Sequence, residues 1–195
     1  MERRAVVERK TGETEIRISW NLDGQGKTRI ATGIPFFDHM LTLFAVHGCF
    51  DLEVDCRGDI EIDWHHSVED VGIVLGDTLA GILGDRKGLV RYGDFVLPMD
   101  ETLCRLALDL SNRPFLVCLL PDPIRSCGPF DPYLAKEFFR AFAVRSGMTL
   151  HIDVPYGENS HHIVEAMFKA LGRALDKAVR LDSRVTGVPS TKGLL

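Results

Sequence analysis

The chain has 195 residues, of which 45% are hydrophobic and 26% charged, so it can bury a sizeable core as one or two domains. Its net charge of −5 and sequence pI near 5.8 argue against a surface for nucleic acid or anionic membrane. No apolar run reaches the roughly 18 residues of a membrane-spanning helix. Because no apolar stretch follows the charged start MERRAVVERK, we expect no signal peptide and a cytoplasmic location, with the five cysteines as reduced thiols.

Hydrophobic periodicity and turn residues predict the elements of the first half in chain order. They are a half-buried strand at 14–20, a hairpin turn at 21–27 into a second strand, a helix from Pro35 to a cap at Gly48, a strand at 50–55, a short strand or loop at 58–64, and a helix from His65 to about Gly84. The hairpin rests on Asp23-Gly24 and Gly26, and the helix end on Gly48, because glycine favours both positions.

The second half repeats this order. Its predicted elements are strands at 102–110 and 113–120, a helix from Pro132 to a cap at Gly147, a strand at 149–154, a helix over 160–181 with Ser160 as N-cap, and a loop over the tail GVPSTKGLL. We therefore predict an α+β fold of two duplicated modules, each a small, mostly antiparallel sheet covered by two helices. The seam is placed in the charged, glycine-punctuated segment 86–94, which gives modules at 1–90 and 91–195.

The strongest sign of duplication is a repeated histidine motif. HHSVED begins at His65 and HHIVEA begins at His161, and seven identities, including a Leu-Gly pair in each helix, share one offset of 96 positions. Chance similarity between apolar helices is common, but a shared His-His and Glu beside it is not. About half of the chain therefore belongs to each copy.

The repeated motif has the residue types of a metal site. His66 and Glu69 are three apart on a predicted helix, as are His162 and Glu165, so each pair projects from one helix face. His39 and His151 lie near equivalent elements of the two halves. Histidine with carboxylate suits Mn, Fe, Co or Zn, whereas Mg or Ca would require more oxygen ligands. A structural zinc site would be richer in cysteine.

Four basic residues and one serine elsewhere in the chain predict an anion pocket. They are Arg91, Arg113, Lys169, Ser190 and Lys192. Arginine supplies a bidentate fork, lysine a point charge, and serine with loop amides the remaining donors. Taken singly, each is more typical of a solvated surface, so the prediction depends on the metal motifs.

Read together, the motifs resemble the imidazoleglycerol-phosphate dehydratase family of histidine biosynthesis. The resemblance covers nearly the whole chain and is carried by NLDGQG, TGIPFFDHML, DWHHSVED, LGDRKGLVRYGDFVLPMDE, SNRPF, SGMTLHI, NSHHIVEAMFKALGRAL and PSTKG. It implies a duplicated fold related to domain 2 of ribosomal protein S5, two manganese ions per active site, and a homo-oligomer of about 24 subunits with closed symmetry. It also implies a phosphorylated small-molecule substrate, with no nucleic-acid or membrane partner.

The resemblance also implies roles for individual residues. Glu13 matches the family's acid–base glutamate, and the five residues of the predicted anion pocket match positions that hold the substrate and its phosphate. The implied metal ligands are His39, His65, His66, Glu69, His151, His161, His162 and Glu165. We expect one ion on His39, His66, Glu69 and His161, and the other on His65, His151, His162 and Glu165. Three residues depart from the family pattern: Leu43 replaces an expected glutamine, and Trp64 and Ser67 replace an aspartate and a threonine.

The expected reaction is a hydro-lyase dehydration of imidazole glycerol phosphate to imidazole acetol phosphate. In the expected mechanism, two metals stabilise an imidazolate, which expels the hydroxyl to leave a diazafulvene-like intermediate, and Glu13 removes the C2 proton. Two alternatives remain open from the residues alone. A dimetal phosphohydrolase would also combine ions with an anion pocket, and a metal-stabilised assembly protein would use the ions only to join subunits.

Overall fold

The computed structural model describes residues 3–121 and 124–193. The first two residues of the charged start and the last two of the predicted C-terminal loop lie outside the described residues. None of the described helices is long and apolar enough to cross a bilayer.

Two sets of elements follow one another with the same order. The first set is β1 (Arg4–Lys10), β2 (Thr14–Asn21), β3 (Thr28–Ala31), α1 (Pro35–His47), β4 (Asp51–Gly58) and α2 (His65–Leu83). The second is β5 (Tyr92–Met99), β6 (Thr102–Asp109), β7 (Phe115–Leu119), α3 (Pro132–Ser146), β8 (Thr149–Tyr156) and α4 (Ser160–Val179). The predicted α+β duplication is therefore confirmed.

The two sheets also have equivalent strand orders, β1-β2-β4-β3 and β5-β6-β8-β7. In each, the first three strands pair antiparallel and the last pairs parallel with its neighbour. The mostly antiparallel character that we predicted is confirmed. Residues 59–64 connect β4 to α2 as a turn and not as a strand.

The predicted hairpin between 14–20 and the following strand is wrong. β2 instead pairs with β1, which the sequence reading missed, and β3 pairs parallel with β4. The reason lies in Asp51 at the start of β4, whose Oδ1 accepts hydrogen bonds from the backbone N–H groups of Gln25 (2.8 Å) and Lys27 (3.0 Å). These bonds hold the loop after β2 against the start of β4. The next strand, β3, therefore pairs with the edge of β4 that faces away from β2.

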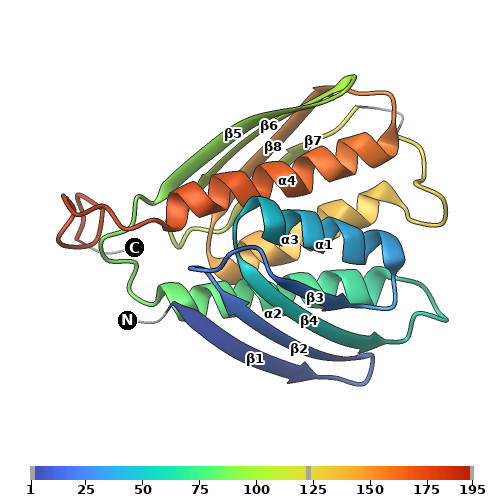
Figure 1. Ribbon diagram of the computed structural model, residues 1–195, viewed down its shortest axis with the longest axis horizontal. Helices are drawn as coiled ribbons and strands as arrows, with labels where there is room; N and C mark the ends of the chain where they lie inside the picture. The colour runs from blue at the N-terminus through green and yellow to red at the C-terminus, as the bar shows by residue number, and fades with distance from the viewer. Residues whose placement is uncertain (1–2, 122–123, 194–195) are drawn as a thin grey trace.

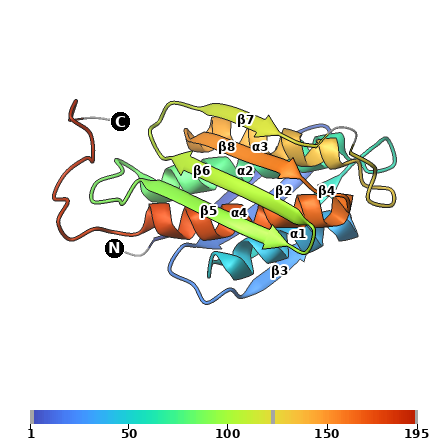
Figure 2. The same cartoon turned by 90° about the horizontal axis from the view of Figure 1, so that it is seen from above.

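The four helices lie between the two sheets, so the molecule has three layers (Figure 1). Viewed from above, the second sheet covers the helices and the first lies beneath them (Figure 2). Each helix packs on one from the other half: α2 on α3, and α1 on α4. One continuous hydrophobic core results. Trp20, for example, has its ring centroid 5.4 Å from Phe50 in its own half and 6.3 Å from Phe142 in the other.

Equivalent glycines permit these helix contacts. A Cβ atom on Gly76 would lie 2.6 Å from the Cβ of Arg145 and 2.9 Å from the carbonyl oxygen of Phe142. A Cβ atom on Gly172 would overlap the carbonyl oxygen of Phe44. Since Phe44 and Phe142 occupy matching places against matching glycines, the two crossings are copies of one another. The Leu-Gly identities in the sequence repeat are explained by this packing.

Both histidine pairs stand at helix N-termini at the same end of the molecule (Figure 1). The predicted cap of α4 is corrected by one residue: Asn159 is the N-cap, and its Oδ1 accepts from the backbone N–H of His161 at 2.9 Å. Ser160 begins the helix, and its hydroxyl accepts from the backbone N–H of Arg125 instead. In α2, Asp63 accepts from the backbone N–H of His65 at 2.7 Å. Short polar side chains thus fix the start of each motif.

Candidate active site

One cluster of possible metal donors joins α1 to α4. The Nε2 atom of His161 is 3.0 Å from Oε2 of Glu165, and the Nε2 atom of His39 is 3.5 Å from the same oxygen. Across residues 3–121 and 124–193, these three residues are the one group of at least three His, Cys, Asp or Glu whose donor atoms all lie within 4.8 Å. Two imidazoles and a carboxylate at such distances suit a transition-metal ion.

Lys169 lies in this cluster, although we predicted it in the anion pocket. Its Nζ atom is 2.5 Å from Oε1 of Glu165. Burial opposes ionisation of Glu165, but the hydrogen bond and charge of Lys169, followed by those of His161, outweigh it and hold the pKa of the carboxyl below its usual value. Glu165 is therefore an anion at neutral pH and available as a ligand.

The equivalent positions of the first half are more open. The Nε2 atom of His65 is 3.6 Å from Oε2 of Glu69, and both side chains are 44% exposed. The side chain of His66 contacts other carboxylates. Its Nδ1 atom lies 3.0 Å and 3.2 Å from the two oxygens of Asp59, and its Nε2 atom is 3.8 Å from Oε1 of Glu13. The hydrogen bond with Asp59 raises the pKa of His66.

In the second half, His162 meets a different carboxylate. Its Nδ1 atom is 2.8 Å from Oε2 of Glu101, in the turn between β5 and β6. The hydrogen bond from His162, followed by one from the backbone N–H of Asn159, holds the pKa of Glu101 far below its usual range. The sequence reading missed Glu101 as well as Asp59. Glu101 was detectable, because Glu13 precedes the first residue of β2 as Glu101 precedes the first residue of β6.

The structure does not bring His151 to the other predicted ligands within one chain. It is exposed on β8 between Ala107 of β6 and Val117 of β7, on the face of the sheet opposite the buried Leu150 and Ile152. By position in the duplicated fold, a different residue corresponds to His39. Matching the helices through Phe44 and Phe142 places Glu137 of α3 at the position of His39 in α1.

The predicted partition of the ligands also differs from the observed grouping. We had separated Glu165 from His39 and His161, and the structure places these three together. Likewise, Glu69 lies beside His65 and not in a shared group with His39. The helix period accounts for the difference, since a residue contacts the one four positions away as readily as the one three positions away.

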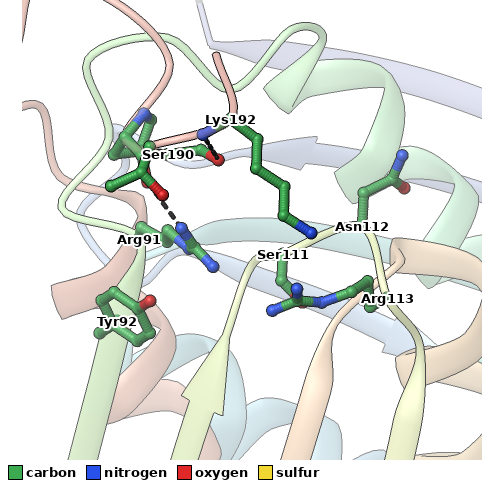
Figure 3. A pocket seen from close by; sticks show the side chains of 9 residues that line it. Arg91, Tyr92, Ser111, Asn112, Arg113, Ser190 and Lys192 are labelled. Atoms are coloured by element: carbon green, nitrogen blue, oxygen red, sulfur yellow. Dashed lines mark hydrogen bonds between the residues drawn. The ribbon is translucent and has the colours of Figure 1, made fainter. Parts of the chain in front are cut away.

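The anion pocket lies at the other end of α4 and is lined by Arg91, Arg113, Ser190 and Lys192, four of the five residues predicted for it. Figure 3 shows their basic groups converging beside Ser111 and Asn112. The pocket is held together by a carboxylate that the sequence reading missed. Arg91 donates from Nε and Nη2 to Asp109 (2.6 Å and 2.9 Å) and from Nη1 to the carbonyl oxygen of Pro189 (2.6 Å).

The hydrogen bonds of Arg91 define its role in this pocket. The pair with Asp109 raises the pKa of the guanidinium, and the bond to Pro189 ties the C-terminal segment to β5. Lys192 is fixed in turn, because its backbone N–H donates to Ser190 Oγ at 3.2 Å. Arg113 is 67% exposed and is 3.7 Å from Asp109, so its guanidinium is open to an incoming anion.

Comparison with known proteins settles which family has this arrangement. The family model described as imidazoleglycerol-phosphate dehydratase matches residues 32–175. The chain belongs to the imidazoleglycerol-phosphate dehydratase family. It is 59% identical over its whole length to the whole imidazoleglycerol-phosphate dehydratase of Desulfosudis oleivorans, and 56% identical over 99% of its length to the whole enzyme of Thermoanaerobacter pseudethanolicus.

Solved structures of the family agree with the fold. The imidazoleglycerol-phosphate dehydratase of Staphylococcus aureus is 40% identical and aligns with a TM-score of 0.80 over 91% of this chain and 100% of that one. The enzyme of Pyrococcus furiosus, solved in complex with (S)-C348, is 36% identical, with a TM-score of 0.84 over 97% of this chain and 100% of that one. Membership makes the chain a hydro-lyase of histidine biosynthesis.

The three departures from the expected family pattern have structural surroundings of their own. Trp64 precedes α2 and packs on Phe130 at 6.2 Å between ring centroids. Ser67 is fully buried in the first turn of α2. Leu43 is half-buried against the hydrophobic core. Trp64 and Leu43 therefore lie against apolar side chains, and Ser67 is closed off from solvent.

Proposed function

We propose that the dehydration depends on two divalent metal ions, with manganese expected, bound by the histidine–glutamate motifs of the two halves. The observation that carries the proposal is the group of His39, His161 and Glu165, whose donor atoms lie within 4.8 Å of one another. The mixture of imidazole and carboxylate, without cysteine, fits an exchangeable transition-metal ion. When bound, such ions act as Lewis acids on the imidazole nitrogens of the substrate.

The proposed ligands of the first ion are His39, His161 and Glu165, and those of the second include His65 and Glu69. His66 and His162 supply further imidazoles from the second position of each pair. Glu137 occupies the place of His39 in the duplicated helix, but its carboxylate pairs with Arg140 at 2.6 Å, so it is not proposed as a ligand. His151 stays a prediction that requires a neighbouring subunit.

Glu13 is the proposed acid–base residue. The substrate carries the leaving hydroxyl on the carbon attached to its imidazole ring, with no carbonyl to acidify the neighbouring C–H bond. Expulsion of this hydroxyl leaves a diazafulvene-like ring, and Glu13 then removes the C2 proton to give an enol that becomes the ketone. Glu13 is 57% exposed and its Oε1 atom is 3.8 Å from Nε2 of His66, so its carboxylate faces open space at the metal motif.

The phosphate of the substrate is proposed to bind between Arg113, Lys192 and Ser190. Arg113 and Lys192 contribute charge, while Arg91 holds the segment of Ser190 and Lys192 in place through Pro189. Arginine forks and hydroxyls are suited to phosphate oxygens. The pocket contributes orientation of the reacting carbons and not the chemistry itself.

The distance between the two sites supports a homo-oligomer. The backbone N–H of Arg91 donates to Ala178 near the end of α4, whereas His161 stands at its beginning. At 1.5 Å per helical residue, the metal motif and the anion pocket of one chain are about 25 Å apart. A small phosphorylated substrate does not span this distance, so we propose that one subunit supplies the phosphate pocket and another the metal ligands. A closed assembly of about 24 subunits is the expected form.

A cytoplasmic location is proposed with the same activity. All five cysteines are free, and burial raises the pKa of Cys104 to about 12 and that of Cys56 to about 11. Such thiols are largely protonated and slow to oxidise, which fits a reducing compartment.

Metal removal tests this proposal. We expect a chelator at neutral pH to abolish formation of the absorbing ketone product and to lower the particle mass, and Mn²⁺ to restore both. Acidification through about pH 6 should act like the chelator, because imidazole must be neutral to bind a metal. Full turnover by protein shown to contain no metal would rule out the proposal. Unchanged mass would rule out ions shared between subunits.

A further inference from the structure

The second histidine of each pair is held by a carboxylate through the same ring atom. In His66 the Nδ1 atom lies 3.0 Å from Asp59, and in His162 it lies 2.8 Å from Glu101. An ionised carboxylate can only accept a hydrogen bond, so Nδ1 must carry the proton in both rings. In the neutral ring, the lone pair is then on Nε2.

The two carboxylates come from unrelated places in the duplicated fold. Asp59 lies in the turn after β4, whereas Glu101 lies in the turn between β5 and β6. The same contact, a carboxylate at Nδ1 of the second histidine, is therefore supplied by a different loop in each half. A contact that is reached from two different loops is difficult to explain as inherited packing alone.

The side chain of Glu101 is itself held in place by several hydrogen bonds. Its Oε1 atom accepts from the backbone N–H of Asn159 (2.8 Å), the backbone N–H of Glu158 (3.2 Å) and the hydroxyl of Thr102 (3.0 Å). Only Oε2 is directed at His162. This saturation makes Glu101 unsuited to proton transfer and well suited to holding a ring in one orientation.

Glu13 differs from Glu101 although it has the matching position before β2. Because Asp59 already occupies Nδ1 of His66, the carboxylate of Glu13 lies on the Nε2 side at 3.8 Å. Because Asp59 takes the Nδ1 atom of His66, Glu13 makes no hydrogen bond with that ring. Glu101, in contrast, is hydrogen-bonded to His162. The two glutamates of the duplication have separate tasks.

We propose that Glu101 and Asp59 are positioning residues, which hold His162 and His66 with the proton on Nδ1 and present Nε2 as the donor to a metal ion. The inference rests on the proposed function, since it assumes that these histidines bind metal. A carboxylate behind a ligating histidine fixes its tautomer and raises its basicity, and losing one usually weakens metal binding by about 10- to 100-fold.

Glu101→Gln is the decisive variant. Glutamine keeps the carbonyl acceptor for Asn159 and Thr102 but offers an amide donor to His162. The ring must then accept at Nδ1 and carry its proton on Nε2, which blocks ligation. We expect the variant to lose one of its two ions to a chelator about 10- to 100-fold weaker than the chelator that removes this ion from the wild type. Turnover should recover in excess Mn²⁺.

Asp59→Ala, which removes the acceptor altogether, should weaken metal retention through His66 in the same way, and Glu61→Gln, an exposed change in the same turn, is the control. Metal per chain is measured after dialysis against chelators of graded strength, with the thermal unfolding of chelated protein as the check on folding. Wild-type metal retention by folded Glu101→Gln and Asp59→Ala would overturn the inference. Absence of bound metal from the wild type would instead overturn the proposed function.

Discussion

The two halves of the chain share their elements and their histidine pairs but differ in what surrounds them. In the first half, Asp70 is buried and accepts from Thr14 Oγ1 at 2.5 Å, while Arg9 Nη1 lies 2.6 Å from the same oxygen. The second half has Ala166 at the position of Asp70, so this position offers no carboxylate for an equivalent pair. Thr14 follows Glu13, so this buried pair anchors the turn that carries the proposed base.

The second half has a feature that the first lacks. Its chain continues past α4 into the segment that closes the anion pocket with Arg91 and Arg113. The comparison teaches that duplication kept the histidine and glutamate positions at two helix N-termini, while the residues around them diverged. We expect the proton-transfer group to belong to one half and the phosphate pocket to the other, so that only the metal positions act as equals.

The largest expected effects test whether the two metal positions are equal. Glu69→Gln and Glu165→Gln should each lower turnover by more than about 100-fold and remove one of two ions, because neither ion suffices alone. The double variant should be no slower than either single one, since residues that act as a unit are non-additive. Turnover and metal content are measured on the same samples.

Unequal effects of the two substitutions would contradict the equivalence of the two metal positions. If one single variant stayed active with half of its metal, one ion would be structural and the two-metal mechanism would be wrong. Lys169 makes the second position the more sensitive to mutation. Glutamine at 165 would leave this ammonium without its carboxylate partner beside the remaining histidines.

Glu13→Gln tests the divergence of the two glutamates. Turnover should fall by at least about 100-fold, the usual contribution of a general base, while metal content and particle mass stay unchanged. Excess Mn²⁺ should not restore it, in contrast to Glu101→Gln. Near-normal turnover of Glu13→Gln would remove Glu13 from the mechanism and leave the two turns without separate roles.

The sequence predicted the repeated parts of the molecule well. A period of alternation or of helical spacing is a local property, so most of the strands and helices were found. Strand partners depend on distant residues, and for this reason the bonds of Asp51 to the loop before β3 escaped prediction. β1 escaped because it is an edge strand with alternately exposed residues, including Val6, and resembles a charged tail.

The sequence predicted the residue types of the candidate site but not their arrangement. The motif His-His-x-x-Glu predicts metal donors, whereas helical spacing alone did not decide which of these side chains meet across α1 and α4. His151 matched the family by residue type and proved to face away from the helices. Asp59, Glu101 and Asp109 were missed, because an orienting carboxylate has no fixed spacing from the group that it holds.

Arg113→Ala tests the assignment of the anion pocket to the second half. Because charge-assisted hydrogen bonds contribute about 1.5–3 kcal/mol, the KM for the phosphorylated substrate should rise about 10- to 100-fold. The kcat should change little if the interaction is equal in ground and transition states. Arg105→Ala, which removes an exposed arginine from the outer face of β6, is the control. An unchanged KM for Arg113→Ala would place the phosphate elsewhere.

The smallest effects concern the helix crossings that keep the two halves equivalent. Gly76→Ala and Gly172→Ala place a methyl group against the backbone of the facing helix, at α3 and α1 respectively. Overpacking of this kind costs about 1–3 kcal/mol, so the thermal unfolding midpoint of each variant should fall by several degrees. Similar losses at the two sites would show that the crossings are energetically as well as geometrically repeated.

Gly81→Ala provides the opposite expectation within α2. No atom lies within 4 Å of a Cβ atom built there, and alanine loses less backbone entropy on folding than glycine. This substitution should therefore stabilise the protein by about 0.4–1 kcal/mol. Because all three changes add the same methyl group to a helix, helix propensity cannot account for a difference in sign between them. If Gly172→Ala also raised the unfolding midpoint, the crossing of α1 and α4 would have room to move, and the close placement of His39 beside Glu165 would not depend on that glycine.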